Sequence, residues 1–315
     1  MRLVTFRAET GPRIGALRDD RVVDLTHLAP DMLGFIELGE KGLGRARDRV
    51  ATAADHETVP LHSVALLAPI PRPRKNIVCL GMNYALHAYE SARARGNPEV
   101  LPEYPVFFTK AVTCVNDPEG AVPLHQDITK QLDWEVELGF VIGRAASHVS
   151  AAQGLDHVFG YTIINDVSAR DLQNRHQQFY FAKSLDGCGP MGPWIVTADE
   201  VPDPHALGIR LRVNGRTMQD SSTADQIFKI PRVIETLSAG VRLEPGDVFA
   251  TGTPAGVGMG MSPQVWLKDG DVMEQGLSVR RESTGCRRRS GGVREFVRLL
   301  PRSQKRDLGH SDLCR

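Results

Sequence analysis

The residues whose spacing most directly predicts chemistry are three carboxylates: Glu135, Glu137 and Asp166. Glu135 and Glu137 lie in QLDWEVELGFVIG, where acidic and apolar residues alternate as in a β-strand, so both carboxylates should share one face with Asp133. Asp166 directly follows the apolar run YTIIN, at the expected end of a buried strand. Carboxylates without His or Cys suit a hard cation such as Mg²⁺ or Mn²⁺. Taken alone, the first segment also fits a half-buried strand with a solvated acidic face.

A second constellation lies in GMNYALHAYE, where His87 and Glu90 are three residues apart. On a helix they would share a face, and a carboxylate beside an imidazole makes the imidazole a better general base. The alternative is an ordinary surface pair. Lys183, in FAKSLDGCG, could stabilise a developing enolate or a substrate carboxylate, or be a surface lysine with a packed stem.

A glycine-rich segment, LEPGDVFATGTPAGVG, offers backbone amides to an anion, with the hydroxyls of Thr251 and Thr253 nearby. It lacks the G-K-[ST] of a phosphate-binding P-loop and the spacing of the dinucleotide fingerprint. The sequence therefore does not predict a nucleotide site here.

The elements that position these residues follow from the local pattern. Short strands and a helix near residues 31–38 predict a small N-terminal α+β unit, and three prolines in LLAPIPRPRK predict a boundary after it. The remainder is rich in short strands. A helix is expected from Tyr84 to about Arg95, with Asn83 as its N-cap and Gly96 as its C-terminal stop.

Composition narrows the class of protein. Lys plus Arg and Asp plus Glu both count 38, so a zero formal charge gives no indication of a nucleic-acid or membrane partner. The five cysteines are scattered, which argues against a disulfide framework or a structural zinc site. No signal-peptide pattern is present at the N-terminus, and we expect a cytoplasmic protein.

The ordered set of motifs resembles the catalytic domain of the fumarylacetoacetate hydrolase family, in the group of acylpyruvate hydrolases and 2-oxo-acid hydratases, decarboxylases and isomerases. The matching stretches run from about Lys75 to Met273 and are GMNYALHAYE, PVFFTK, LDWEVELGFVIG, GYTIINDVSARDLQ, AKSLDGCGPMGPW, LRVNGRTMQD, SAGVRLEPGDVFATGTPAGVG and LKDGDV. The resemblance implies an α+β fold, a mixed β-sheet roll preceded by a small N-terminal α+β domain, and a homodimer.

The resemblance also implies roles for individual residues. The metal, Mg²⁺ or Mn²⁺, is expected on Glu135, Glu137 and Asp166. The catalytic residues are expected to be His87 and Glu90, on a lid segment that activates water, together with Lys183. Substrate contacts are expected from Thr253, Arg170 and Gln173.

The implied function is hydrolysis of a C–C bond in an acylpyruvate-like or fumarylacetoacetate-like acid through a metal-stabilised enolate. The alternative is a 2-oxo-acid decarboxylase, hydratase or isomerase of aromatic catabolism, acting on oxaloacetate or a 2-hydroxymuconate-type acid.

Expected domains are residues 1–70, 71–274 and an atypical tail, 275–315. The tail has eleven Lys or Arg against four Asp or Glu and departs from the family pattern. We expect it to be disordered, frameshifted or divergent, and an inactive relic is a second alternative.

Overall fold

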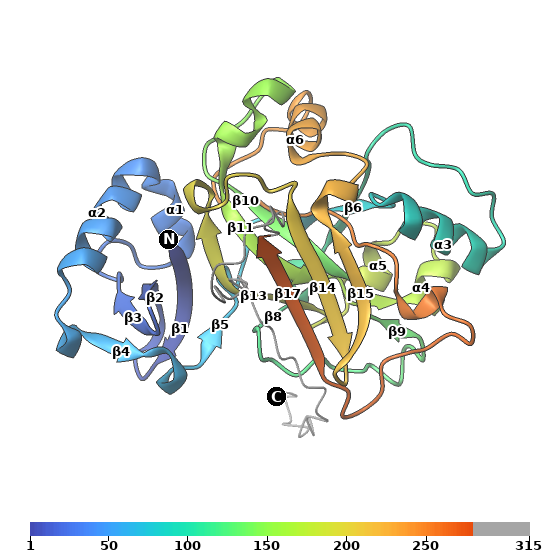
Figure 1. Cartoon of the computed structure of the whole chain (residues 1–315), viewed down its shortest axis with the longest axis horizontal. Coiled ribbons are helices and arrows are strands. Elements are labelled where there is room, and N and C mark those ends of the chain that lie inside the picture. The colour runs from blue at the N-terminus through green and yellow to red at the C-terminus, as the bar shows by residue number, and fades with distance from the viewer. Residues whose placement is uncertain (280–315) are drawn as a thin grey trace, which may run out of the picture.

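A computed structural model describes residues 1–279 of the 315-residue chain. The described part combines a large mixed sheet, smaller sheets and peripheral helices (Figure 1), which confirms the predicted fold class. The α-helices are α1 (Met32–Glu37), α2 (Gly39–Thr52), α3 (Ala85–Arg95), α4 (Arg170–Arg175), α5 (Tyr180–Lys183) and α6 (Ile230–Ser238). The strands are β1 (Arg2–Ala8), β2 (Gly11–Arg18), β3 (Arg21–Asp24), β4 (Thr58–Pro60), β5 (Leu66–Leu67), β6 (Ile77–Gly81), β7 (Val106–Lys110), β8 (Val115–Asn116), β9 (Leu132–Asp133), β10 (Val136–Ile142), β11 (Val158–Asn165), β12 (Ser168–Ala169), β13 (Gly189–Thr197), β14 (Leu207–Val213), β15 (Arg216–Ser222), β16 (Val248–Ala250) and β17 (Met273–Val279). Within residues 1–279, no helix is long and apolar enough to cross a membrane.

The N-terminal strands continue the large sheet, whose order is β4-β3-β2-β1-β13-β11-β10-β16-β6-β7. Arg2 and Leu3 of β1 pair with β13, so the N-terminal unit is joined to the rest by backbone hydrogen bonds. Phe35 of α1 also packs edge-to-face on Phe159 of β11, with ring centroids 6.5 Å apart. The three strands and the helix expected in this unit are present.

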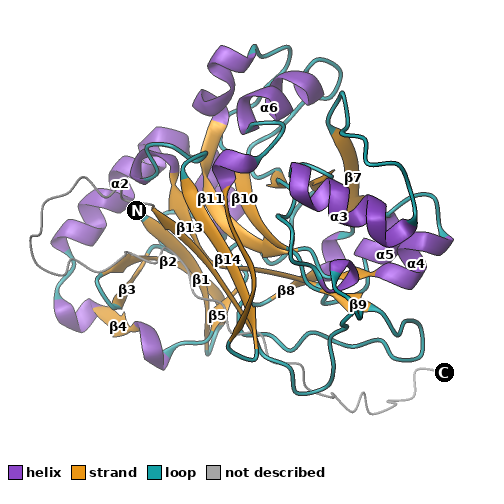
Figure 2. Ribbon diagram, turned by 45° about the vertical axis from the view of Figure 1, so that its right-hand side comes forward, coloured by secondary structure: helices purple, strands orange, loops and turns teal. Residues whose placement is uncertain are grey.

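Strand β10 lies inside the sheet, between β11 and β16. All of its residues are buried, because α1 covers one side of the β10–β11 region and a second sheet covers the other. The interpretation of a half-buried strand with a solvated acidic face is therefore wrong. Helices α3, α4 and α5 group together at one end of this sheet (Figure 2).

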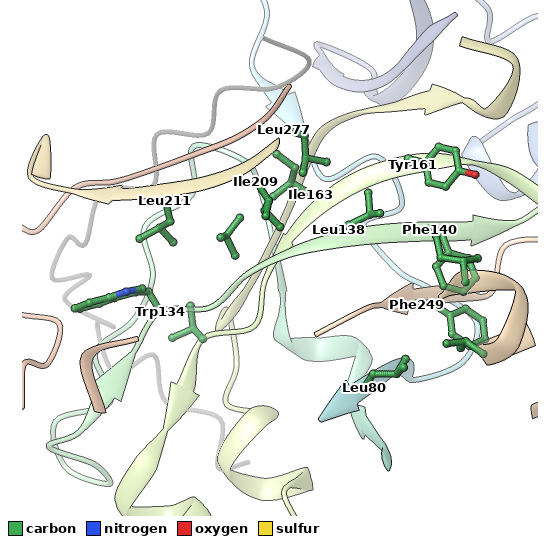
Figure 3. Close-up of a cluster of buried hydrophobic side chains, with 14 of the residues drawn as sticks. Leu80, Trp134, Leu138, Phe140, Tyr161, Ile163, Ile209, Leu211, Phe249 and Leu277 are labelled. Carbon is green, nitrogen blue, oxygen red and sulfur yellow. The ribbon is translucent and has the colours of Figure 1, made fainter. Parts of the chain in front are cut away.

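The second sheet has the order β15-β14-β17 and closes the roll. Its inward side chains, among them Ile209 of β14 and Leu277 of β17, join Leu138 and Ile163 of the large sheet in one apolar cluster (Figure 3). Burial of this cluster removes apolar surface from water and holds the two sheets together.

Strand β17 corrects the predicted domain boundary at residue 274. Residues 273–279 pair antiparallel with all of β14, and Gln275 and Leu277 are buried. The inward Met273 and Leu277 join the core cluster, and the backbone groups of the strand are satisfied by β14, so this segment completes the sheet. The predicted disorder or frameshift of the remaining tail concerns residues outside the described range 1–279.

Replacement of Leu277 by Ala should lower the free energy of unfolding by about 2–5 kcal/mol, as for other buried leucines. The reason is the cavity left between the two sheets, where Leu277 is 4% exposed. Denaturant unfolding would measure the change. Ser278→Ala, on the opposite side of the same strand, should change stability by less than about 0.5 kcal/mol. Equal small effects from both substitutions would show that β17 does not contribute to the core.

Helix α3 ends at Gly96 as predicted, with a left-handed φ of 66°. Its N-cap is Tyr84, so the assignment of Asn83 as the cap is wrong. The Asn83 side chain instead donates to the carbonyls of Thr251 and Phe228 and accepts from the Phe228 amide. It therefore fixes the start of α3 to distant segments of the chain.

Candidate metal centre and active site

The three predicted carboxylates converge at one end of the paired strands β10 and β11. Val136, the first residue of β10, pairs with Asn165, the last residue of β11. Glu135 and Glu137 are the chain neighbours of Val136, and Asp166 directly follows Asn165. One oxygen from each carboxylate lies within 4.8 Å of the others, and all three side chains are buried. The antiparallel register therefore brings a strand start and a strand end together into one acidic cluster.

The electrostatics of this cluster differ between its two glutamates and are unfavourable for the ionised form of Glu137. Burial, and then repulsion from Asp166 and Glu135, raises the pKa of Glu137 well above its ordinary value. Burial would also raise the pKa of Glu135, but attraction to Lys183 and Arg170 outweighs it, and the pKa falls. A hard divalent cation fits this oxygen-only set and would relieve the repulsion at Glu137.

Two buried lysines surround Asp166. Lys183, at the end of α5, places its Nζ 2.6 Å from Glu135 and 2.8 Å from Asp166. Lys110, at the end of β7, lies 2.7 Å from the other Asp166 oxygen and donates to the carbonyls of Cys188, Val167 and Lys183. Burial alone would lower the pKa of Lys110, but Asp166 and its other partners raise it. The interpretation of Lys183 as a surface lysine is thus wrong.

Lys110 was not singled out by its sequence, where it is one lysine at the end of a strand. The available signal was its place in PVFFTK, one of the stretches that carry the family resemblance. Its full burial and its bond to Asp166 make it the group that orients that carboxylate.

Helix α3 brings His87 and Glu90 to the same site. The Nδ1 atom of His87 lies 3.3 Å from Glu90, and the Nε2 atom lies 4.0 Å from Glu135. Glu90 also accepts from the Gly256 amide at 3.1 Å. His87 is 7% exposed, so an ordinary solvated surface pair does not describe this dyad. The arrangement leaves Nε2 as the imidazole atom nearest the metal-binding carboxylates.

Arg170, at the start of α4, supports the cluster from another side. Its Nε donates to Asp133 at 2.8 Å, its Nη2 lies 2.7 Å from Glu135, and its Nη1 donates to Gln173 at 3.1 Å. Asp133 accepts as well from the amides of Gly258 and Met259. Asp133 therefore anchors Arg170 and a loop, and it is not part of the carboxylate set that could hold a metal.

The glycine-rich loop after β16 contacts the cluster through its backbone. The Gly252 amide donates to Glu137 at 2.7 Å, as expected of a segment able to approach an anion. Thr253 donates to the Val136 carbonyl at 2.9 Å and accepts from Gln219 at 2.7 Å. These bonds fix the position of Thr253 beside the site.

A cavity unites most of the predicted residues. Its lining consists of Leu80, Gly81, Met82, His87, Ser91, Arg95, Phe108, Glu135, Glu137, Arg170, Gln173, Phe179, Lys183 and Thr253. Two of the three carboxylates, Glu135 and Glu137, therefore face one space with the dyad imidazole and the candidate substrate contacts, whereas Asp166 and Glu90 lie outside this lining. Arg95 was not predicted from the sequence.

Residues 76–289 match the family model described as fumarylacetoacetate (FAA) hydrolase C-terminal. The chain is 48% identical over 262 residues to oxaloacetate tautomerase YisK of Bacillus subtilis, covering 81% of this chain and 86% of the relative. It is 40% identical over 283 residues to the mitochondrial oxaloacetate tautomerase fahd2 of Xenopus laevis, covering 87% and 86%. The structure of maleylpyruvate hydrolase from Sphingobium sp. SYK-6 in complex with manganese (II) ion and pyruvate is 29% identical, with a TM-score of 0.73 and coverage of 97% and 100%. The chain belongs to the fumarylacetoacetate hydrolase family of enzymes, as the motifs predicted.

Proposed function

We propose that this enzyme is a metal-dependent tautomerase that interconverts the enol and keto forms of a short 2-oxo dicarboxylic acid, with oxaloacetate as the first candidate. The observation that carries the proposal is the buried His87 imidazole, held by Glu90 and facing the cluster of Glu135, Glu137 and Asp166. The similarity to two proteins named oxaloacetate tautomerases supports this choice over the hydrolysis that the sequence put first.

Glu135, Glu137 and Asp166 are the residues that would hold the metal, because their oxygens converge and repulsion from the other two carboxylates helps to raise the pKa of Glu137. The structure of the similar maleylpyruvate hydrolase with manganese and pyruvate supports Mn²⁺ as the ion, and the oxygen-only set also suits Mg²⁺. When bound, such a cation would act as a Lewis acid on the 2-oxo oxygen. Lys183 and Arg170 hold Glu135 in place for this role.

The proton transfer falls to His87. Conversion of enol to keto removes a proton from the enol oxygen and adds one to C3. Nε2 of His87 is the imidazole atom that faces the cavity, whereas Nδ1 faces Glu90. Glu90 therefore fixes the tautomer and supports the charged imidazole while it carries the proton.

The test is the decay of the enol absorbance of oxaloacetate, added as the enol form, with and without the protein. We expect acceleration over the buffer rate in Mg²⁺ or Mn²⁺ and none in excess chelator. Wild-type rates that match buffer in both metals would refute the proposal.

Hydrolysis of an acylpyruvate is the second candidate, because the same dyad is placed to activate a water molecule. Acetopyruvate separates the two functions, since its cleavage yields acetate and pyruvate and its tautomerisation yields neither. Release of pyruvate at a rate comparable with enol decay would favour hydrolysis. Metal-dependent turnover of either acid would exclude an inactive relic.

A further inference from the structure

Helix α3 presents a third polar side chain to the cavity. His87, Ser91 and Arg95 are spaced four residues apart, so they lie along one face of the helix, and all three line the cavity. His87 and Ser91 contact each other, with Oγ and Nε2 3.4 Å apart. Arg95 extends this face by one more turn and has no role in the chemistry described above.

Arg95 is a half-buried cation that lines the cavity and has no anionic partner in the described part of the chain. Its Nε atom is inaccessible to solvent and has no hydrogen-bond partner there. Its guanidinium carbon lies 5.9 Å from the centre of the Phe179 ring. Partial burial, and then the charge of Arg170, lowers the pKa of Arg95, while the weaker effect of the Glu135 charge acts in the opposite direction.

The other cations of the cavity lining do not share this condition. Arg170 is paired with Asp133 and Glu135, and Lys183 is paired with Glu135 and Asp166. Arg95 is therefore the cationic side chain in this lining that is left to pair with an incoming anion.

A helix-stabilising role does not explain this position. A basic residue in the last turn of a helix is favourable for the helix dipole, but that effect does not require burial. Arg93, in the same turn, can interact with the helix dipole from the surface. It pairs with Glu99 at 3.3 Å and is 63% exposed. Arg95 turns inward instead.

We propose that Arg95 binds the carboxylate of the substrate that lies farthest from the 2-oxo group, and so selects dicarboxylic over monocarboxylic oxo-acids. The inference rests on the proposed function and adds to it the residue that recognises the second carboxylate. A planar guanidinium suits a carboxylate because it can donate two parallel hydrogen bonds. Arg95 would also connect substrate binding to α3, the helix that carries the dyad.

The test uses two unreactive probes that differ by one carboxylate: malate and lactate. Calorimetric titration of the Mn²⁺-loaded protein should show tighter binding of malate. Arg95→Gln should weaken malate binding by about 10- to 100-fold, as expected for a lost hydrogen bond to a charged group, and leave lactate binding unchanged. Arg95→Lys should retain part of the preference.

Arg93→Gln is the matched control, since it removes a cation from the same turn of α3 without touching the cavity. It should keep the wild-type preference for malate. Equal losses for malate and lactate in Arg95→Gln, or a wild-type protein with no preference for malate, would overturn the assignment. Because binding is measured without turnover, the result stands apart from the tautomerase assay, whose failure alone would leave the preference for malate intact.

Discussion

Glu137→Gln should abolish metal-dependent turnover and, at the same time, make the metal-free protein more stable. The first effect follows because the substitution removes one of three converging carboxylates. The second follows from the raised pKa of Glu137: its ionised form is less favourable in the folded than in the unfolded protein at neutral pH. Gln keeps the shape and an oxygen that can still accept from the Gly252 amide.

Thermal unfolding with and without Mn²⁺ measures both effects. The wild-type protein should gain stability with metal, by about 2.7 kcal/mol at 100 times the dissociation constant. In chelator, the Glu137→Gln protein should have a higher melting temperature than the wild-type protein. Addition of Mn²⁺ should not raise that melting temperature further. Glu99→Gln, which removes a surface carboxylate paired with Arg93, should behave as wild type. A full metal response in Glu137→Gln would remove Glu137 from the metal site.

His87→Ala should reduce kcat for enol decay by about 10² to 10⁴-fold, the usual range for a lost general acid–base group. Its metal-induced stabilisation should persist, because His87 is not one of the three converging carboxylates. Steady-state kinetics and thermal unfolding on the same preparation separate the two properties. Added imidazole should restore part of the rate by occupying the vacated space.

A matched surface control for this prediction is His56→Ala, because His56 is exposed and lies in the N-terminal unit. It should retain wild-type kcat. Loss of metal-induced stabilisation in His87→Ala would indicate that the imidazole serves the metal site rather than proton transfer.

The sequence was sufficient to predict the acidic cluster because its signal is local. Alternation placed Glu135 and Glu137 together, and the end of an apolar run marked Asp166. The same alternation also suggested a solvated acidic face for β10, which is wrong. Helix α1 and the second sheet cover β10, and contacts between such distant segments cannot be read from a local pattern.

Long-range partners account for the other errors. Asn83 looked like a helix cap, yet its amide bonds to residues more than 140 positions away. Lys110 and Arg95 have ordinary local sequences, and their burial depends on segments that pack later in the chain. Strand β17 does alternate, with Met273 and Leu277 buried, but the polar Gln275 interrupts its inward face, and its pairing with β14 is a long-range contact.

The loop that holds the dyad and the carboxylates does so with main-chain amides, at Gly252, Gly256 and Gly258. Replacement of the side chain at Pro254 or Ala255 would therefore leave every one of these donors in place. The glycines would respond strongly, since a Cβ at Gly256 would lie 2.0 Å from the Met218 carbonyl oxygen. A tolerance map of this loop should therefore show intolerant glycines close to a permissive position at the part-exposed Ala255, and truncation of side chains alone would understate how much the site depends on the segment.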